Sequence, residues 1–220
     1  MNRAIDAVLF DLDGVIVRSD EYHYRGWKQL ADEEGWDFDK TLNHQLRGVS
    51  RMDSLQIILD HNNVEISEEE KRALADRKNG YYRQSLSDMN EGDYIPGAVE
   101  LMDELSNSSV KMAICSSSRN APFILDVLGI ADRFETVVSG HDIDRAKPDP
   151  QIFLLAAERI GVPAARCVVF EDAESGIQAA RNAGMHSVGV GSADHLPSAT
   201  VVVADLTEMS VDRLLDEARP

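Results

Sequence analysis

The sequence predicts an α/β protein: a core built on a doubly wound parallel sheet, with an α-helical cap domain inserted into it. From about residue 94 to the C-terminus, short apolar runs alternate with helical segments, which is the pattern of a parallel sheet covered by helices. A further buried strand lies at the N-terminus, and the residues between it and position 92 show only helical patterns. We therefore expect a core of residues 1–17 and 93–220 and a cap of residues 18–92, with hinges at 17–19 and 92–93.

The first strand, residues 5–10, is a short apolar run of the kind that is buried on both faces of a sheet. Asp11, Leu12, Asp13 and Gly14 follow it directly, and Gly14 allows the backbone to turn sharply. Because ligands bind at the carboxyl ends of parallel strands, we expect Asp11 and Asp13 to lie in a site. One carboxylate can attack phosphorus, the other can transfer a proton, and Mg²⁺ would offset their repulsion of a phosphate. The alternative is chance, because Asp and Glu make up 39 of the 220 residues.

The cap is expected to contain helices at residues 21–34, 39–46, 51–61 and 67–88. In the first of these, Tyr22, Trp27 and Leu30 recur at helical spacing, and Gly35 ends the helix. The last begins with Ser67-Glu68-Glu69-Glu70, the pattern of a capping box.

The core continues with strands and helices in alternation. The expected strands cover residues 110–115, 136–138, 167–170, 186–190 and 200–203. The expected helices run from about 97 to 107, up to 128, from 150 to 160, from 174 to 182, and from about 210 onward. Pro150 suits the first turn of its helix, and Gly161 suits the end.

Polar side chains follow several of these strands, and in a parallel sheet such positions share one edge. Besides Asp11 and Asp13 they are the serines at 116–118, Lys147 and the pair Glu171-Asp172. Hydroxyls and N–H groups at a helix start can bind phosphate, a lysine supplies a point charge, and the acid pair can complete a cation site. Each group alone has a plainer explanation, since serines and acids cap helices and a lone lysine is usually solvated. Together they indicate metal-assisted phosphoryl transfer.

Composition narrows the class of protein further. The net charge of −17 argues against nucleic acid and anionic membranes as partners, and an anionic substrate would need a locally positive pocket. Cys115 and Cys167 lie in apolar, strand-like runs, which favours buried thiols in a reducing cytosol over a disulfide. Asp6 and Asp11 make the N-terminus unlike a signal peptide, and no run of about 18 apolar residues occurs. We expect a cytoplasmic monomer that acts on a small molecule.

The converging strand ends resemble the motifs of the haloacid dehalogenase superfamily of phosphotransferases, whose core is Rossmann-like. The matching residues are DLDGV at 11–15, Ser116, Lys147-Pro148 and EDAESG at 171–176. A helical cap inserted after the first motif is also known in that family. The resemblance implies that Asp11 is the nucleophile and Asp13 the general acid/base, and that Ser116 and Lys147 hold the phosphoryl group. It also implies a Mg²⁺ site made by Asp11, the main-chain carbonyl of Asp13, Asp172 and the adjacent Glu171.

The expected cap carries polar residues of its own. His23 and Trp27 lie four residues apart, on one face of a helix. Residues 46–55, LRGVSRMDSL, contain Gly48, which permits a close backbone approach, and Arg51, which can bind a phosphate through two hydrogen bonds. The triplet RKN at 77–79 adds positive charge. The plainer explanations are a structural histidine, a helix start capped by Ser50, and a solvated basic face.

These cap residues, together with SSSRNAPF at 116–123, are similar to the β-phosphoglucomutase family. That family interconverts β-D-glucose 1-phosphate and β-D-glucose 6-phosphate through an aspartyl-phosphate and β-D-glucose 1,6-bisphosphate, with Mg²⁺ as cofactor. By resemblance, Arg51 binds the phosphate that is not transferred, assisted by Ser118 and Asn120. The substrate-binding residues implied are His23, Trp27, Leu46, Gly48, Val49, Ser50, Arg51, Ser54 and Lys78 in the cap, and Ser116, Ser117, Ser118, Asn120 and Lys147 in the core. The chain departs from the family at the hinge, where Arg18 and Ser19 stand in place of an acidic residue and a threonine.

Two alternatives to a mutase remain open. A phosphatase for a sugar phosphate or a small organic phosphate would use the same core motifs, but it would not need Arg51 and Ser54 as a second phosphate-binding group. A catalytically silent binding or regulatory protein is disfavoured because the motif residues are all present: Asp11, Asp13, Ser116, Lys147 and Asp172.

Overall fold

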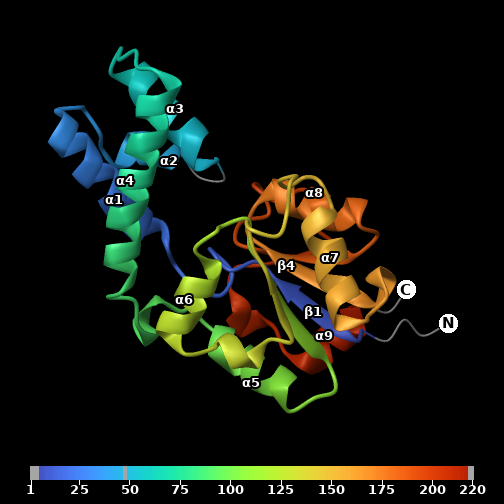
Figure 1. Cartoon of the computed structure of the whole chain (residues 1–220). Helices are drawn as coiled ribbons and strands as arrows, with labels where there is room; N and C mark the ends of the chain where they lie inside the picture. Colours follow the sequence, from blue (N-terminus) through green and yellow to red (C-terminus); the bar gives the residue numbers. More distant parts are fainter. Residues whose placement is uncertain (1–4, 47–48, 218–220) are drawn as a thin grey trace. The chain divides into compact units, whose positions relative to one another are not determined.

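The computed structural model describes residues 5–46 and 49–217, and the chain divides into two compact units (Figure 1). The core unit consists of Met1–Arg18 and Asn90–Pro220, and the cap unit is Ser19–Met89. The two connecting segments run antiparallel at the edge of the core unit, because Val17 pairs with Tyr94 and Arg18 N donates to Asp93 O over 2.8 Å. A short 3₁₀ helix, η1 (Glu91–Asp93), capped by Asn90, opens the second part of the core unit.

The core unit is built on a parallel sheet, as the alternating pattern predicts. Within the described residues six strands pair in the order β3-β2-β1-β4-β5-β6. They are β1 (Ala7–Phe10), β2 (Lys111–Cys115), β3 (Thr136–Val138), β4 (Cys167–Glu171), β5 (His186–Val190) and β6 (Val201–Val203). The strand order reverses between β1 and β4, and sheets of this topology bind ligands at that point, outside the carboxyl ends of the strands.

Helices lie on both sides of this sheet (Figure 1). One layer consists of α7 (Gln151–Ile160) and α8 (Glu174–Asn182), and alternate strand residues such as Leu9, Ala113 and Val169 pack with Phe153 and Ala180 in a fully buried cluster. The other helices of the core unit are α5 (Ala98–Ser106), which packs on β2 and on α9 (Val211–Glu217), and α6 (Ala121–Leu128). Short 3₁₀ helices are η2 (Ala131–Arg133), η3 (Ala164–Arg166) and η4 (Leu206–Glu208).

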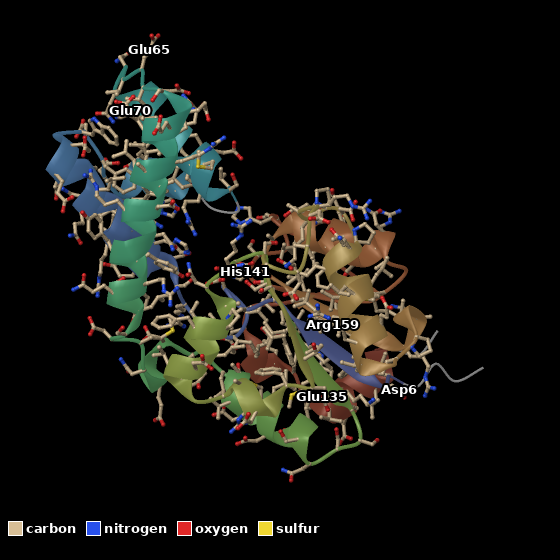
Figure 2. All side chains as sticks on the ribbon, viewed as in Figure 1. Asp6, Glu65, Glu70, Glu135, His141 and Arg159 are labelled. Carbon is tan, nitrogen blue, oxygen red and sulfur yellow. The ribbon has the colours of Figure 1, made fainter. Side chains whose placement is uncertain are left out.

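Side chains tie the strand starts together on the side of the sheet away from the motif residues. Asp6, before β1, accepts a hydrogen bond from Arg166, before β4, over 2.5 Å. Glu135, before β3, accepts from the N–H of Met112 in β2 over 2.7 Å. Asp6 and Glu135 are labelled in Figure 2. The hydrophobic pattern of the strands sets their register, and that register aligns the strand ends opposite these contacts.

The cap unit is helical, as predicted. It contains α1 (Asp20–Glu34), α2 (Lys40–His44), α3 (Arg51–His61) and α4 (Glu68–Leu86), and α1 packs along α4. The predicted capping box at the start of α4 is confirmed: Glu70 N donates to Ser67 Oγ, and Ser67 N donates to Glu70 Oε2. The second helix is shorter than the predicted 39–46, because Gln45 and Leu46 close tight turns onto carbonyls three residues back and end α2 at His44.

Both cysteines are buried and free, as expected, and burial raises the pKa of the Cys167 thiol to about 11. In the described parts of the chain, no helix is long and apolar enough to cross a membrane.

Candidate active site

The strand register brings the predicted motif residues of the core unit together. Phe10, the last residue of β1, pairs with Ile114 on one side and Phe170 on the other. Asp11 therefore follows β1 between the ends of β2 and β4, and its N–H donates to Phe170 O over 2.9 Å. The side chain of Asp11 is buried at this edge, with the residue 7% exposed.

Lys147 is the group around which the acidic residues gather. Its ammonium donates to Asp11 Oδ1 over 2.5 Å, to Glu171 Oε2 over 2.8 Å and to the carbonyl of Cys115 over 3.1 Å. It also lies 5.1 Å from the centre of the Phe153 ring, and its side chain is buried. The lysine is thus not a solvated surface residue but is fixed beside the carboxylate expected to act as the nucleophile.

Charge and burial shift the pKa values of this cluster in opposite directions. Burial alone would lower the pKa of Lys147, but the negative charges of Asp11 and Glu171 outweigh that effect and raise it. Burial raises the pKa of Glu171 to about 7, although the nearby Lys147 acts in the opposite direction. Lys147 therefore stays protonated at neutral pH and can offset negative charge at Asp11.

A metal-binding arrangement lies at the same edge. Carboxylate oxygens of Asp11, Glu171 and Asp172 lie within 4.8 Å of one another. Gly14 makes the close approach of Asp172 possible: its φ is +85°, and a Cβ there would lie 2.1 Å from Asp172 Oδ2. Desolvation and the charges of Asp11 and Glu171 raise the pKa of Asp172 to about 8, so the group is short of positive charge. An all-oxygen donor set with excess negative charge fits a hard divalent cation.

The serines after β2 form the loop that leads into α6. Ser116 Oγ lies 3.5 Å from Asp13 Oδ2, to which it donates, and it accepts from the N–H of Ser118 over 3.1 Å. Ser118 Oγ in turn accepts from the N–H of Asn120 over 3.1 Å. Ser116 and Asn120 are buried, whereas Ser117 is exposed. The plainer explanation, that these serines cap the helix, is wrong: the N-cap of α6 is Asn120, with no side-chain cap hydrogen bond, and Ser116 and Ser118 bind N–H groups of the loop instead. Ser116 in addition contacts the predicted acid/base Asp13.

In the cap unit, four side chains of α1 and α4 form one cluster. Three of them were predicted as substrate-binding residues and the fourth was not. Lys78 Nζ lies 3.0 Å from His23 Nδ1 and within 5 Å of the ring centres of Trp27 (4.6 Å) and Tyr82 (4.8 Å). The ring of Tyr82 stacks on that of His23, with 4.0 Å between centroids. Lys78 is only 2% exposed, so the interpretation of the RKN triplet as a solvated face is wrong for this residue, although Arg77 does form surface ion pairs with Glu33 and Glu34.

Burial and neighbouring positive charges lower the pKa values of the basic groups in this cluster. Burial and the charge of Arg51 lower the pKa of Lys78 to about 7. Burial, Lys78 and Arg51 likewise lower the pKa of His23. The cap unit thus holds buried, easily deprotonated basic groups beside a permanently charged guanidinium.

Replacing Lys78 by methionine should raise the free energy of unfolding at pH 7 by on the order of 1–3 kcal/mol, because a buried ammonium is exchanged for an apolar chain of similar length. Lysine in the unfolded chain titrates near pH ~10.4, so between about pH 7 and pH 10 the unfolded state binds more protons at this position and wild-type stability rises with pH. The variant should lack this rise. Urea unfolding of wild type and variant at about pH 7 and about pH 10 measures this rise in stability. Lys40→Met is the control, since the side chain of Lys40 is 73% exposed. If the Lys78 variant is instead less stable than wild type by the same amount at both pH values, the assignment of a lowered pKa to Lys78 is contradicted.

The stretch 46–55 includes the start of α3, as the predicted helix at 51–61 requires. Arg51 begins α3 and lies 3.7 Å from Asp76, and Ser50 caps the helix by accepting from Asp53 N over 3.2 Å, as the plainer explanation proposed. Ser54 is buried in the first turn of the same helix. Leu46 is part of the hydrophobic core of the cap unit, and Val49 is half-buried. Gly48 lies outside the described residues.

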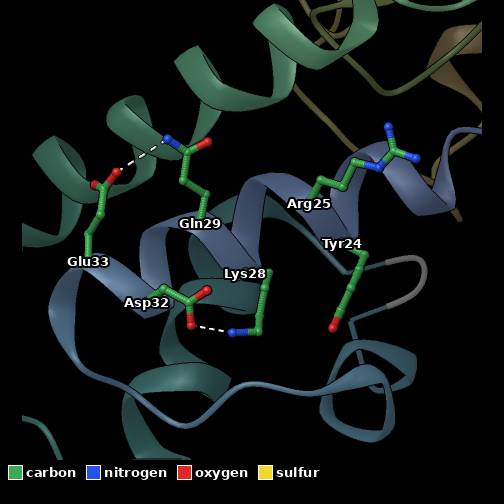
Figure 3. Close-up of a pocket in the computed structure, with 6 residues that line it drawn as sticks. All are labelled: Tyr24, Arg25, Lys28, Gln29, Asp32 and Glu33. Atoms are coloured by element: carbon green, nitrogen blue, oxygen red, sulfur yellow. Dashed lines mark hydrogen bonds and ion pairs between the residues drawn. The ribbon is translucent and has the colours of Figure 1, made fainter.

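A separate pocket of about 460 Å³ lies on the surface of α1 (Figure 3). Its lining consists of Tyr24, Arg25, Lys28, Gln29, Asp32 and Glu33. Hydrogen bonds within the helix, from Lys28 to Asp32 and from Gln29 to Glu33, satisfy much of its polar surface. None of the predicted site residues lines it, so it is not the site indicated by the motifs.

Sequence reasoning missed two contributors to these clusters. Tyr82 follows Lys78 by four residues and so lies on the same face of α4, a spacing that could have identified it. The carbonyl of Cys115, an acceptor for Lys147, has no sequence signal, because every residue carries a carbonyl.

Comparisons with known proteins show which proteins the chain is similar to. The sequence model of the haloacid dehalogenase-like hydrolase family matches residues 5–184. β-Phosphoglucomutase of Bacillus subtilis is 41% identical over 213 residues, covering 96% of this chain and 94% of that protein. Fructose-1-phosphate phosphatase of Escherichia coli is 33% identical over 183 residues, covering 83% of this chain and 95% of that protein. The crystal structure of β-phosphoglucomutase from Clostridium difficile matches with a TM-score of 0.88 at 37% identity, covering 97% of both chains.

Proposed function

Because the chain belongs to the haloacid dehalogenase-like hydrolase family and is an isomerase/phosphotransferase enzyme similar to β-phosphoglucomutases, we propose that it interconverts β-D-glucose 1-phosphate and β-D-glucose 6-phosphate. The observation that supports phosphoryl transfer is the buried carboxylate of Asp11 at the end of β1, which accepts a hydrogen bond from Lys147. The 41% identity to the Bacillus subtilis enzyme over almost the whole chain supports the choice of substrate.

In the proposed reaction, an oxygen of Asp11 forms a bond to phosphorus as the bond from phosphorus to the donor sugar oxygen breaks. Asp13 gives its proton to the departing oxygen and later takes the proton of the sugar hydroxyl that attacks the aspartyl-phosphate. β-D-Glucose 1,6-bisphosphate is the phosphate donor that primes the enzyme and the intermediate between the two half-reactions. Lys147 and Ser116 hold the phosphoryl oxygens, and the positive charge of Lys147 offsets the charge that develops there.

The acid cluster of Asp11, Glu171 and Asp172 is proposed to hold Mg²⁺, with the main-chain carbonyl of Asp13 as a further ligand. When bound, the ion supplies positive charge that lets an anionic carboxylate approach a phosphate dianion. Substrate selection is assigned to the cap unit: His23, Trp27, Ser54 and Lys78 bind the sugar, and Arg51 binds the phosphate that is not transferred.

The decisive experiment is ³¹P NMR of the enzyme with β-D-glucose 1-phosphate, Mg²⁺ and a trace of β-D-glucose 1,6-bisphosphate. The proposal predicts conversion to glucose 6-phosphate with little release of inorganic phosphate. The second candidate, a sugar-phosphate phosphatase, is favoured by the 33% identity to fructose-1-phosphate phosphatase of Escherichia coli. Inorganic phosphate as the main product would establish that candidate instead.

Chelation should abolish activity, because Lys147 is the only cation found beside the acid cluster among the described residues and cannot neutralise Asp11, Glu171 and Asp172 together. Turnover measured in EDTA should fall to background and return when Mg²⁺ is added in excess. Asp172→Asn should require a higher Mg²⁺ concentration for half-maximal turnover. Full activity in chelator would contradict the metal site.

Arg51→Ala should reduce kcat/KM for β-D-glucose 1,6-bisphosphate by roughly 10- to 100-fold, the value of a hydrogen bond to a charged group. Hydrolysis of acetyl phosphate should hardly change, since that substrate has no second phosphate to bind. Arg77→Ala is the matched control, because Arg77 pairs with surface glutamates of the same unit. Equal losses on both substrates would show that Arg51 supports the fold, through contacts such as that with Asp76.

A further inference from the structure

The carboxylate of Glu171 lies directly against the first turn of α8, at Gly176. A Cβ on Gly176 would lie 2.1 Å from Glu171 Cδ and 2.2 Å from Glu171 Oε2, well inside contact distance. Gly176 is the third residue of α8 and is buried, and its N–H donates to Ala173 O over 3.0 Å. The space that holds the carboxylate therefore exists because residue 176 has no side chain.

The backbone gives no other reason for a glycine at this position. Gly176 has helical conformation, with no positive φ that would exclude other residues. Glycine is less favourable than alanine inside a helix, so its presence here opposes helix stability. The close approach of Glu171 is the feature of the structure that requires it.

The atom that meets Gly176 is the atom that binds the lysine of the active site. Glu171 Oε2 accepts from Lys147 Nζ over 2.8 Å, and Glu171 Oε1 lies 3.3 Å from the N–H of Ala173, from which it accepts. Glu171 is 2% exposed, so its carboxylate has little freedom to move elsewhere. A methyl group at position 176 must displace Oε2, and the ammonium that Oε2 holds beside Asp11 would follow.

We infer that Gly176 is a positioning residue for phosphoryl transfer: its bare Cα lets Glu171 pack against α8 and so holds Lys147 beside Asp11. The chain of contacts runs from Gly176 to Glu171, from Glu171 to Lys147 and from Lys147 to Asp11. This inference goes beyond the choice of sugar, because a mutase and a phosphatase both need Asp11 and Lys147 in this arrangement. It therefore holds whichever of the two candidate functions the enzyme performs.

The first test is the rate at which acetyl phosphate phosphorylates Gly176→Ala, a reaction that needs no sugar and separates this inference from the proposed substrate. A displacement of about 1 Å at a reacting group costs about 10²-fold, so we expect a loss of about 10- to 100-fold in this phosphorylation rate. Gly80→Ala is the matched control, because Gly80 also lies inside a helix and a Cβ there meets nothing within 4 Å. The control should keep the wild-type rate. A folded Gly176→Ala protein with the wild-type rate would overturn the inference.

The second test relieves the steric clash by changing Glu171, the partner of Gly176. Glu171→Ala removes Cγ, Cδ and Oε2, the three atoms that a Cβ at position 176 would meet. Alone it should lower the rate, because Lys147 loses an acceptor. With Ala at 171, the further change Gly176→Ala should cost less than about threefold, so that the two substitutions are strongly non-additive. A merely structural role of Gly176 in the packing of α8 would not produce this rescue.

The second test also applies if Gly176→Ala alone does not fold. The double variant is then compared with Glu171→Ala, in both rate and thermal unfolding temperature. Similar values support the inference, since the methyl group is tolerated once the side chain of Glu171 is gone. A double variant that is unfolded, or is slowed by Gly176→Ala as much as the wild type is, would show that residue 176 acts through other neighbours.

Discussion

Asp11→Asn is expected to lower turnover by about 10⁴-fold or more, because an amide is a poor nucleophile toward phosphorus and no other group replaces it. Asparagine has nearly the same shape and can still accept the hydrogen bond of Lys147, so the fold should persist. Lys147 also keeps its contact with Glu171, which limits any loss of stability. The measurement combines turnover of β-D-glucose 1-phosphate with mass spectrometry of the protein after reaction with acetyl phosphate, which should add a phosphoryl group to wild type only.

Asp6→Asn is the matched control for this experiment. Asp6 lies at the opposite end of the first strand and pairs with Arg166 on the surface. It should therefore be dispensable for phosphoryl transfer. Near-normal turnover of Asp11→Asn, or a phosphoryl group attached to that variant at the same rate as to wild type, would rule out a covalent intermediate on Asp11.

Lys147→Met should have the largest effect on stability, a loss of about 3–5 kcal/mol at neutral pH, because it leaves the buried carboxylates of Asp11 and Glu171 without their cation. Activity should be lost as well, since no ammonium remains to hold the phosphoryl group. Arg145→Met is the control: its partner is Asp149, and its side chain is 67% exposed. A surface pair of this kind contributes at most about 1 kcal/mol.

The cost of Lys147→Met should depend on pH in a defined direction. Burial already raises the pKa of Glu171 to about 7, and without Lys147 it rises further above its value in the unfolded chain. The unfolded state then releases its proton at lower pH than the folded state, so the variant loses stability as pH rises from about 4.5 toward 8. Urea unfolding at pH 5 and pH 8 should show the larger difference from wild type at pH 8. A difference that grows as pH falls would contradict the assignment of Lys147 as the cation of this cluster.

The edge of the core unit that carries the motif residues could be predicted because it depends on local patterns. Apolar runs mark the strands, and the residue that follows a parallel strand must lie at the common edge. Asp11 and Glu171 are distant in sequence, yet the pairing of Phe10 with Phe170 makes them neighbours. The capping box at Ser67 was predictable for the same reason, since both of its hydrogen bonds lie within one turn. The end of α2 could not be predicted from the sequence. The tight turns at Gln45 and Leu46 differ little in energy from a continued helix, so the sequence does not favour one over the other.

By itself, the sequence determined the class of fold, the residues at the strand ends and the phosphoryl-transfer chemistry that they indicate, because strand and helix periods and motif spacing are properties of neighbouring residues. The tertiary structure alone decided which of the charged residues are buried and what they contact. Lys78 and Arg77 are adjacent in the same basic triplet, yet one is enclosed by aromatic rings and the other lies at the surface. Lys147 likewise obtains its acceptors from three different strand ends. Burial and pKa depend on groups that the fold brings together from distant parts of the chain, and no local pattern records them.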